Sequence, residues 1–230
     1  MEPGSRACRG RACDQRTMPS SLSDAWDGNA ADWIVWAREP DHDSYWRFHR
    51  GRFLGLVPDP GQLTIDVGCG EGRVGRDLAA RGHTVIGVDA SAALTQACVH
   101  HPHGHPGMVG DAARLPVRGG VADLVVAFMS LHDVDDLDGA VAEAARILRT
   151  GGRFHLAIVH PINSAGTFAD EPAADVAPFV IAGSYTDTFC YVDGVNRDGL
   201  TMTFHGCHRP LTTYARALRA AGSSSRPSRR

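Results

Sequence analysis

The chain has 230 residues, enough for one medium-sized domain with appendages. It is 43% hydrophobic and 21% charged, as globular proteins are, and its longest apolar stretch, residues 121–129, is far too short to cross a bilayer. All 23 basic residues are arginine. The absence of lysine excludes Schiff-base enzymes, the GxxxxGK(S/T) phosphate loop and Ser-x-x-Lys acyl transfer.

Charge and cysteine usage exclude further classes. Residues 17–198 carry 13 arginines against 24 acidic residues, whereas residues 199–230 hold six arginines and no acid. An acidic body argues against a specific nucleic acid partner, which needs a basic face on the folded domain. The six cysteines form no C-x-x-C pair and the first residues lack a signal-peptide core, so we expect free thiols, a cytoplasmic location and no membrane.

The first 57 residues divide into two parts. Residues 1–21 are rich in Gly, Arg and Ser and predict a disordered leader. Residues 22–57 contain all four tryptophans and predict two short helices that break near Glu39-Pro40. Two interpretations of this aromatic segment stay open: ordinary core packing, or a helical lid over a ligand.

From residue 58 onward, short apolar runs alternate with amphipathic segments, which predicts an α/β fold with a doubly wound, mostly parallel sheet. Ser91 and Asp136 are predicted N-caps, and Gly82 and Gly151 are predicted to end helices with positive φ. We predict one domain over residues 58–222 with an insertion at 162–208. The predicted strands are 63–67, 84–88, 108–109, 124–129 and 154–159, and the predicted helices are 72–81, 91–99, 137–149 and 211–221.

A glycine-rich turn follows the first predicted strand with the spacing G-x-G-x-G, at Gly68, Gly70 and Gly72. In doubly wound sheets ligands bind at the carboxyl ends of the strands, and glycine there lets the backbone approach a ligand closely. The sixth position of a dinucleotide motif is Arg73 instead of glycine, which disfavours a nicotinamide or flavin cofactor without excluding it. By itself the triplet equally fits a tight strand-to-helix turn.

Two aspartates follow the next two strands. Asp89 lies 21 residues after Gly68, where a carboxylate can accept both ribose hydroxyls of an adenosine, and Asp111 follows the third strand, where it can accept from an adenine amine. Each aspartate alone also fits a helix cap or a turn. Three successive strand ends that agree favour a single nucleoside site.

Five segments between residues 62 and 161 carry a family resemblance: IDVGCGEGR, VIGVDAS, GDAARLPV, ADLVVAFMSLHDVDD and ARILRTGGRFHLAIVHP. They resemble the class I S-adenosylmethionine-dependent methyltransferases, in particular small-molecule enzymes with the ubiquinone-biosynthesis-like core. The resemblance implies S-adenosylmethionine as the cofactor and a small molecule as the methyl acceptor. It implies no metal.

The same resemblance implies which residues hold the cofactor. The loop Gly68–Gly72, including Cys69 and Gly70, would cradle the methionine part, with Asp66 or a neighbour at its ammonium group. The remaining implied contacts are Asp89 and Ala90 for the ribose, Asp111 and Ala112 for the adenine, and Met129 and Ser130 beside the methyl group.

Methyl transfer from a sulfonium depends mainly on alignment and exclusion of water, so a general base is optional. For an amine or hydroxyl acceptor the candidate bases are His132, after the fourth strand, and His160, after the fifth. His205 and His208 are further candidates, because Phe204–Leu211 resembles an FHHRPL-like element of relatives. For each histidine a structural hydrogen bond is the alternative. The His100–His105 tract predicts a floppy loop instead of a zinc site, because prolines and glycine interrupt it.

The family pattern continues through two more strands after the helix at 211–221, whereas residues 223–230 predict a disordered tail. We therefore expect a sheet without its last two strands and an uncovered edge along 154–159. One hypothesis is that the reading frame is lost near Ser223, which the coding DNA in the other two frames would test. Two other functions stay open, a nicotinamide-dependent oxidoreductase and an inactive cofactor-binding partner subunit, as does a homodimer.

Overall fold

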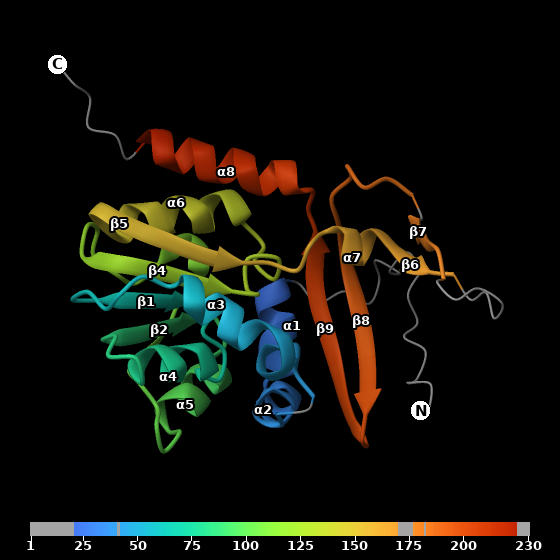
Figure 1. Cartoon of the computed structure of the whole chain (residues 1–230), viewed down its shortest axis with the longest axis horizontal. Helices are drawn as coiled ribbons and strands as arrows, with labels where there is room; N and C mark the ends of the chain where they lie inside the picture. The colour runs from blue at the N-terminus through green and yellow to red at the C-terminus, as the bar shows by residue number, and fades with distance from the viewer. Residues whose placement is uncertain (1–20, 41, 170–176, 182, 225–230) are drawn as a thin grey trace.

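The computed structural model describes residues 21–40, 42–169, 177–181 and 183–224. Its centre is a parallel five-stranded sheet in the order β3-β2-β1-β4-β5, which confirms the predicted α/β class (Figure 1). Residues 1–20 of the predicted leader and the tail beyond residue 224 lie outside the described residues, whereas Ser21 is the N-cap of α1. The sheet strands are β1 (Thr64–Val67), β2 (Val85–Asp89), β3 (Gly107–Val109), β4 (Ala122–Phe128) and β5 (Leu148–Ala157).

Most strand limits agree with the prediction to within two residues, but β5 begins six residues early. The reason is the pairing of Leu148 with Ala122, followed by a register shift before Leu124 pairs with Arg153. The helices are α1 (Leu22–Gly28), α2 (Ala30–Arg38), α3 (Arg50–Leu56), α4 (Arg73–Ala79), α5 (Ala92–Val99), α6 (Leu137–Ile147), α7 (Ile162–Ala165) and α8 (Leu211–Ser224). None of the described helices has the length and apolar character that a bilayer crossing needs.

The predicted N-caps are confirmed, as is the positive φ of both glycines, but α6 ends at Ile147 and Gly151 lies within β5 instead of at the end of that helix. The Ser91 hydroxyl accepts from the backbone N–H of Leu94 (3.2 Å), and the Asp136 carboxylate accepts from that of Gly139 (2.9 Å). Gly82 and Gly151 have φ of 93° and 81°, a region that residues with a Cβ rarely adopt.

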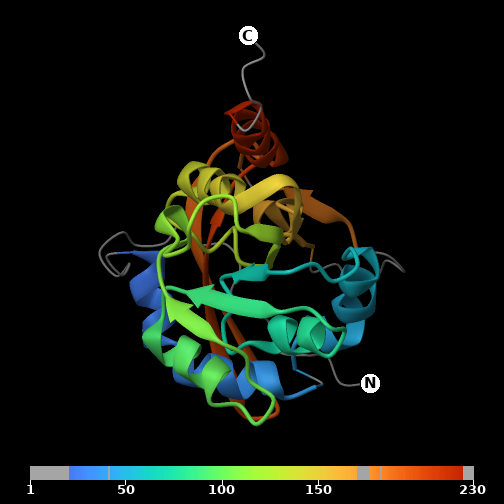
Figure 2. The same cartoon turned by 90° about the vertical axis from the view of Figure 1, so that its left-hand side faces the viewer.

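Two apolar layers enclose the sheet. On one face α3 and α4 cover β2 and β4, with Phe53, Leu78 and Val126 in the same cluster. On the other face α6 covers β1 and β4 through Ala144 and Ile147, and α8 packs outside α6 through Tyr214. Figure 2, which looks at the molecule from the left of Figure 1, shows α3 and α6 on opposite sides of the strands.

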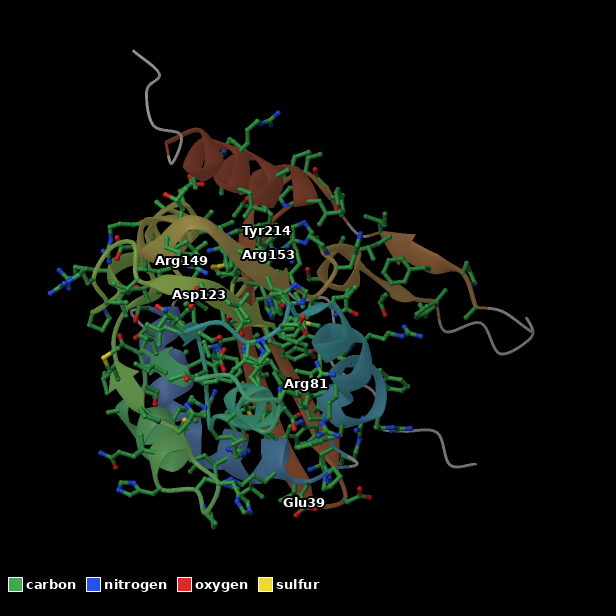
Figure 3. All side chains as sticks on the ribbon, turned by 60° about the vertical axis from the view of Figure 1, so that its left-hand side comes forward. Glu39, Arg81, Asp123, Arg149, Arg153 and Tyr214 are labelled. Atoms are coloured by element: carbon green, nitrogen blue, oxygen red, sulfur yellow. A yellow bond between two sulfur atoms is a disulfide. The ribbon has the colours of Figure 1, made fainter. Side chains whose placement is uncertain are left out.

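The amino-terminal ends of the strands are fastened by one carboxylate far from the loops of interest. Asp123 at the start of β4 accepts from the backbone N–H groups of Gln62 (2.5 Å) and Leu63 (2.7 Å) and pairs with Arg149 of β5. Figure 3 labels Asp123 and Arg149 near one another at this end. Function is therefore to be sought at the opposite, carboxyl ends.

The segment before the sheet is more broken than predicted. The break at Glu39 is confirmed, since α2 ends at Arg38, but α1 and α2 are separate helices and α3 continues a short π-helical segment, Tyr45–His49. The expected two helices are thus three, because Asn29 caps the end of α1 and precedes α2 directly.

Two hairpins follow the sheet. The first is β6 (Gly166–Phe168) with β7 (Phe179–Ile181), and the second is β8 (Phe189–Arg197) with β9 (Leu200–His208). In Figure 1 the β8–β9 hairpin stands across the carboxyl ends of the sheet strands, with α1 and α2 between them. Cys190 and Cys207 lie opposite each other in this hairpin and form a disulfide, with Cα atoms 4.0 Å apart. The expectation of free thiols is wrong for this pair and confirmed for Cys69 and Cys98.

Candidate functional site

A cavity of about 850 Å³ lies at the carboxyl ends of the sheet strands. The loops that follow β1, β2, β3, β4 and β5 all contribute to its wall, and α1, α2 and the β8–β9 hairpin complete it. Of the sequence-predicted residues, the structure places these along the wall: Gly68, Cys69, Gly70, Asp89, Ala90, Asp111, Ala112, Met129, Ser130, His132, His160 and His205. The three strand ends that the sequence associates therefore share one space.

Two contacts fix the glycine-rich loop: Gly68 packs closely against Ser130, and the Asp89 carboxylate binds the loop backbone. Gly68 has φ of 69°, and a Cβ at this position would lie 2.4 Å from the Ser130 Cβ. The Asp89 carboxylate accepts from the backbone N–H of Gly70 (2.8 Å) and from that of Ser91 (2.9 Å). Burial raises the pKa of Asp89, and these two backbone N–H groups oppose the rise. The turn after β1 is thus tied to the end of β2.

Two neighbours of this loop have special backbone or side-chain contacts. Met129 has φ of 53°, which is rare for a residue with a side chain. The Ser130 hydroxyl donates to the Val67 carbonyl (2.8 Å), so the loop after β4 is fixed to the end of β1. The Asp111 carboxylate accepts from the backbone N–H of Ala113 (2.8 Å), and Asp111 lines the cavity.

Asp66 and Gly72 are not among the cavity-lining residues. Asp66 is 1% exposed, and burial raises its pKa to about 7. Gly72 begins α4 with φ of 90°, where a Cβ would meet the Cys98 sulfur at 2.6 Å. Both residues lie on the side of the loop away from the cavity, so they support the loop instead of lining the cavity.

Behind the glycine-rich loop, Cys98 and His105 form a buried cluster that the sequence analysis missed. The Cys98 sulfur lies 3.4 Å from His105 Nε2, and both side chains are buried. The predicted floppy loop is therefore wrong at His105. Hydrogen bonds from Cys69 and His105 lower the pKa of Cys98 to about 5, while the pKa of Cys69 is raised. In the sequence, the only sign that His105 turns inward is its place between the apolar segments of α5 and β3.

Aromatic side chains form one wall of the cavity. Trp26 and Trp33 line it, and both meet Phe204 of β9 edge to face at centroid distances of 6.4 and 6.2 Å. Trp36 is 3% exposed and does not line the cavity. Trp36 thus belongs to the core, whereas Trp26 and Trp33 border the cavity.

Arg73, at the position where a dinucleotide motif has glycine, is buried and lines the cavity. Its guanidinium pairs with Asp43 (2.9 Å) and lies over the rings of Trp33 (4.8 Å) and Tyr45 (5.0 Å). Sequence reasoning noted Arg73 only as a missing glycine and missed Asp43, since nothing local links two residues thirty positions apart.

Of the four histidine candidates, His132 is mostly buried and lines the large cavity. Its side chain is 11% exposed, its Nε2 lies 3.5 Å from the Asp133 carboxylate, and its Nδ1 is buried without a hydrogen-bond partner among the described residues. Burial, followed by the positive charge of Arg209, lowers the pKa of His132 to about 4. The imidazole is therefore neutral at physiological pH.

The other three histidines differ in position. His160 is exposed at the cavity rim, where its Nδ1 accepts from the backbone N–H of Ile162 (3.2 Å). His205 pairs with Val192, so the alternation of the strand turns its side chain to the face opposite Phe204. His208 lies outside the large cavity, between the Ser164 hydroxyl (2.8 Å) and the Tyr185 carbonyl (2.9 Å), stacked on Phe189.

The described residues contain no group of three or more His, Cys, Asp or Glu side chains arranged to hold a metal ion.

Part of the chain matches a known protein family. Residues 65–156 match the family described as "Methyltransferase domain". The chain is 36% identical over 117 residues to an uncharacterized methyltransferase of Synechocystis, covering 50% of this chain and 55% of that protein. It is 34% identical over 113 residues to the ubiquinone/menaquinone biosynthesis C-methyltransferase UbiE of Caulobacter vibrioides, covering 43% and 44%. The chain thus spans about half the length of these curated relatives.

A solved structure supports the same assignment at the level of the fold. The S-adenosylmethionine-dependent methyltransferase from Mesorhizobium loti superposes with a TM-score of 0.60 and 21% identity, over 80% of this chain and 82% of that one. Residues 65–156 are therefore similar in sequence to a methyltransferase domain, and the structure has the fold of this solved methyltransferase. That solved enzyme is named as dependent on S-adenosylmethionine, and the match to the methyltransferase domain includes the turn after β1, Asp89 and Asp111.

The contact between Gly68 and Ser130 predicts that two glycine-to-alanine substitutions lower the free energy of unfolding by different amounts. Gly68→Ala places a left-handed residue against Ser130, whereas Gly120→Ala has the same φ problem, 70°, but no atom within 4 Å of the new Cβ. We expect both to lose about 1 kcal/mol from backbone conformation, and Gly68→Ala to lose a further 1–3 kcal/mol from overpacking, by urea unfolding. Equal losses would show that the Ser130 contact is soft.

The lowered pKa of His132 predicts an acid-sensitive term in stability. The unfolded imidazole gains its proton near pH 6.5 and the folded one only near pH 4, so acid favours unfolding in this window. At pH 5 the term is about 2 kcal/mol. His132→Gln removes it, so the free energy of unfolding of this variant relative to wild type should improve by that amount between pH 7.5 and pH 5. His103→Gln, at an exposed imidazole, is the control and should show no such change.

Proposed function

We propose that this chain transfers the methyl group of S-adenosylmethionine to a small-molecule acceptor. One observation carries the proposal: the loops after β1, β2 and β3 meet in a single cavity, which extends to the β8–β9 hairpin. Pockets of about 300–1,000 Å³ hold small ligands, so 850 Å³ is room for a cofactor and a modest acceptor.

The groups present fit the cofactor. In this proposal Gly68, Cys69 and Gly70 hold the methionine part, and Asp89 with Ala90 holds the ribose. Each carboxylate oxygen of Asp89 accepts one backbone N–H and still has lone pairs for a ribose hydroxyl. Asp111 and Ala112 face the adenine, and Met129 and Ser130 border the methyl group. Asp66 supports the loop from behind instead of meeting the cofactor ammonium.

When bound, S-adenosylmethionine supplies a methyl group on a good leaving group. The chain's own task is then to align the acceptor and exclude water, which contributes roughly 7–11 kcal/mol in well-oriented reactions. In domain terms we propose that residues 22–57 act as the lid through Trp26 and Trp33, and that the insertion at 162–208 supplies the acceptor side through β8 and β9.

Among the histidines we assign proton transfer to His132. It is neutral and its Nδ1 is unpaired in the cavity wall, which a base requires. His160 at the rim is a second contact for the acceptor. His205 faces away from Phe204 and His208 is saturated by Ser164 and Tyr185, so both have structural roles in this proposal.

The relatives do not identify the acceptor. Several are named for C-methylation in ubiquinone or menaquinone biosynthesis, but the family match ends at residue 156, before β8 and β9. The segments that form the acceptor wall therefore have no counterpart in the matched region. A nicotinamide-dependent oxidoreductase is the second candidate, and only the glycine-rich loop supports it. Arg73, which pairs with Asp43, stands at the position of the third glycine of a dinucleotide motif.

Calorimetry on the full chain tests the cofactor half of the proposal. We expect S-adenosylhomocysteine and S-adenosylmethionine to bind and NAD not to bind, followed by methyl release to an acceptor from a panel of amines, phenols and carboxylates. Preferred binding of NAD would contradict the proposal. Cofactor binding without transfer to any acceptor would favour the inactive partner subunit.

The ribose assignment predicts the effect of Asp89→Asn. Replacing the carboxylate by an amide removes a charge-assisted acceptor, so the affinity for S-adenosylhomocysteine should fall by about 1.5–3 kcal/mol, measured by titration calorimetry. Asp138→Asn, at an exposed aspartate of α6, is the matched control and should bind as wild type does. An unchanged affinity in Asp89→Asn would place the ribose elsewhere.

A further inference from the structure

The charge of the cavity wall is strongly one-sided. Eight of the described lining residues are aspartate or glutamate, and Arg73 is the one arginine among them. Arg73 is already neutralised by Asp43 at 2.9 Å. An anionic acceptor would find no free cation on this wall, so the distribution disfavours carboxylates and phosphates.

Most of the acids have structural partners or belong to the cofactor end. Glu71 pairs with Arg76 (2.8 Å) and Arg38 (3.2 Å). Asp135 accepts from the backbone N–H of Leu22 (3.0 Å), and Asp136 caps α6. With Asp43 paired and Asp89 and Asp111 assigned to the cofactor, two acids of the wall remain.

The remaining acids, Asp133 and Asp193, lie at the hairpin end of the cavity. A Cβ on Gly206 would be 3.0 Å from Asp133 Oδ1 and 2.9 Å from the Tyr191 hydroxyl, so these two groups are neighbours. Burial raises the pKa of Asp133 well above its usual range. Asp193 Oδ1 is buried and has no hydrogen-bond partner among the described residues. Asp193 is thus the carboxylate whose acceptor capacity is unused.

Aromatic residues share the face of the hairpin on which this carboxylate lies. Asp193 pairs with Phe204 across the hairpin, so both side chains point to the same face, and Tyr191 follows on that face two residues away. Phe204 meets Trp26 and Trp33 edge to face. An acceptor-only oxygen set among aromatic rings is the arrangement that recognises an organic cation.

We infer that the hairpin end of the cavity is a subsite for the ammonium group of a small organic amine, held by Asp193 and packed on Phe204 and the lid tryptophans. The inference rests on the proposed function and names its acceptor class. For transfer, the ammonium gives one proton to solvent by way of His132 Nδ1, since burial and Arg209 prevent this imidazole from keeping the proton. The nitrogen lone pair then forms the C–N bond while the C–S bond breaks, and that electron pair stays on sulfur, giving S-adenosylhomocysteine.

The test uses three probes with the same ring and different head groups: 2-phenylethylamine, 2-phenylethanol and 3-phenylpropanoate. They are titrated into the full chain saturated with S-adenosylhomocysteine, and the readout is tryptophan fluorescence, because all four tryptophans lie in residues 26–46 and two line the cavity. We expect the amine to bind at least about tenfold more tightly than the alcohol, and the carboxylate to bind least.

Two variants separate recognition by Asp193 from general charge. Asp193→Asn should remove about tenfold of the amine affinity and leave the alcohol unchanged, whereas Asp187→Asn, at an exposed aspartate before the same hairpin, should leave both unchanged. An alcohol that binds as well as the amine, an amine preference that survives Asp193→Asn, or no binding of any probe would overturn the inference. Failure of S-adenosylhomocysteine itself to bind would instead overturn the proposed function.

Discussion

The buried guanidinium of Arg209 holds the two halves of the site together. Arg209 is 6% exposed. Its guanidinium donates to four backbone carbonyls of the loop after β4, those of Leu131 (3.4 Å), His132 (3.4 Å), Val134 (2.6 Å) and Asp135 (3.3 Å). A buried guanidinium is costly unless its N–H groups are satisfied, so the loop after β4 must keep these carbonyls in place. Since Arg209 directly follows β9, the hairpin cannot shift without the loop that carries His132.

The same cation sets the protonation of the acceptor end. Its positive charge adds to burial in lowering the pKa of His132, whereas for Asp133 it acts against burial. A neutral imidazole, an enclosed carboxyl group and the uncommitted Asp193 follow from one electrostatic arrangement. Removing Arg209 would therefore change both the geometry and the charge of the site, and its effect could not be assigned to either alone.

The parts of this structure that the sequence could predict are local. Apolar runs fix the strands, Ser91 and Asp136 cap their own helices, and Gly68 and Asp89 follow their own strands, so periodicity and turn chemistry are sufficient for them. The parts that could not be predicted depend on distant segments. Arg73 meets Asp43, and Asp193 acquires its role only because the hairpin register sets it opposite Phe204. The same register turns His205 away, although the sequence alone places it one residue from Phe204.

This division between local and distant determinants separates the cofactor end from the acceptor end. In the proposed function, backbone groups and two strand-end aspartates form the cofactor end, within the residues that match the methyltransferase family. The acceptor wall comes from side chains of α1, α2, β8 and β9, which lie outside that match. Substitutions at Tyr191, Asp193 or Phe204 can thus alter the acceptor while the turn after β1, held by Ser130 and Asp89, keeps its shape.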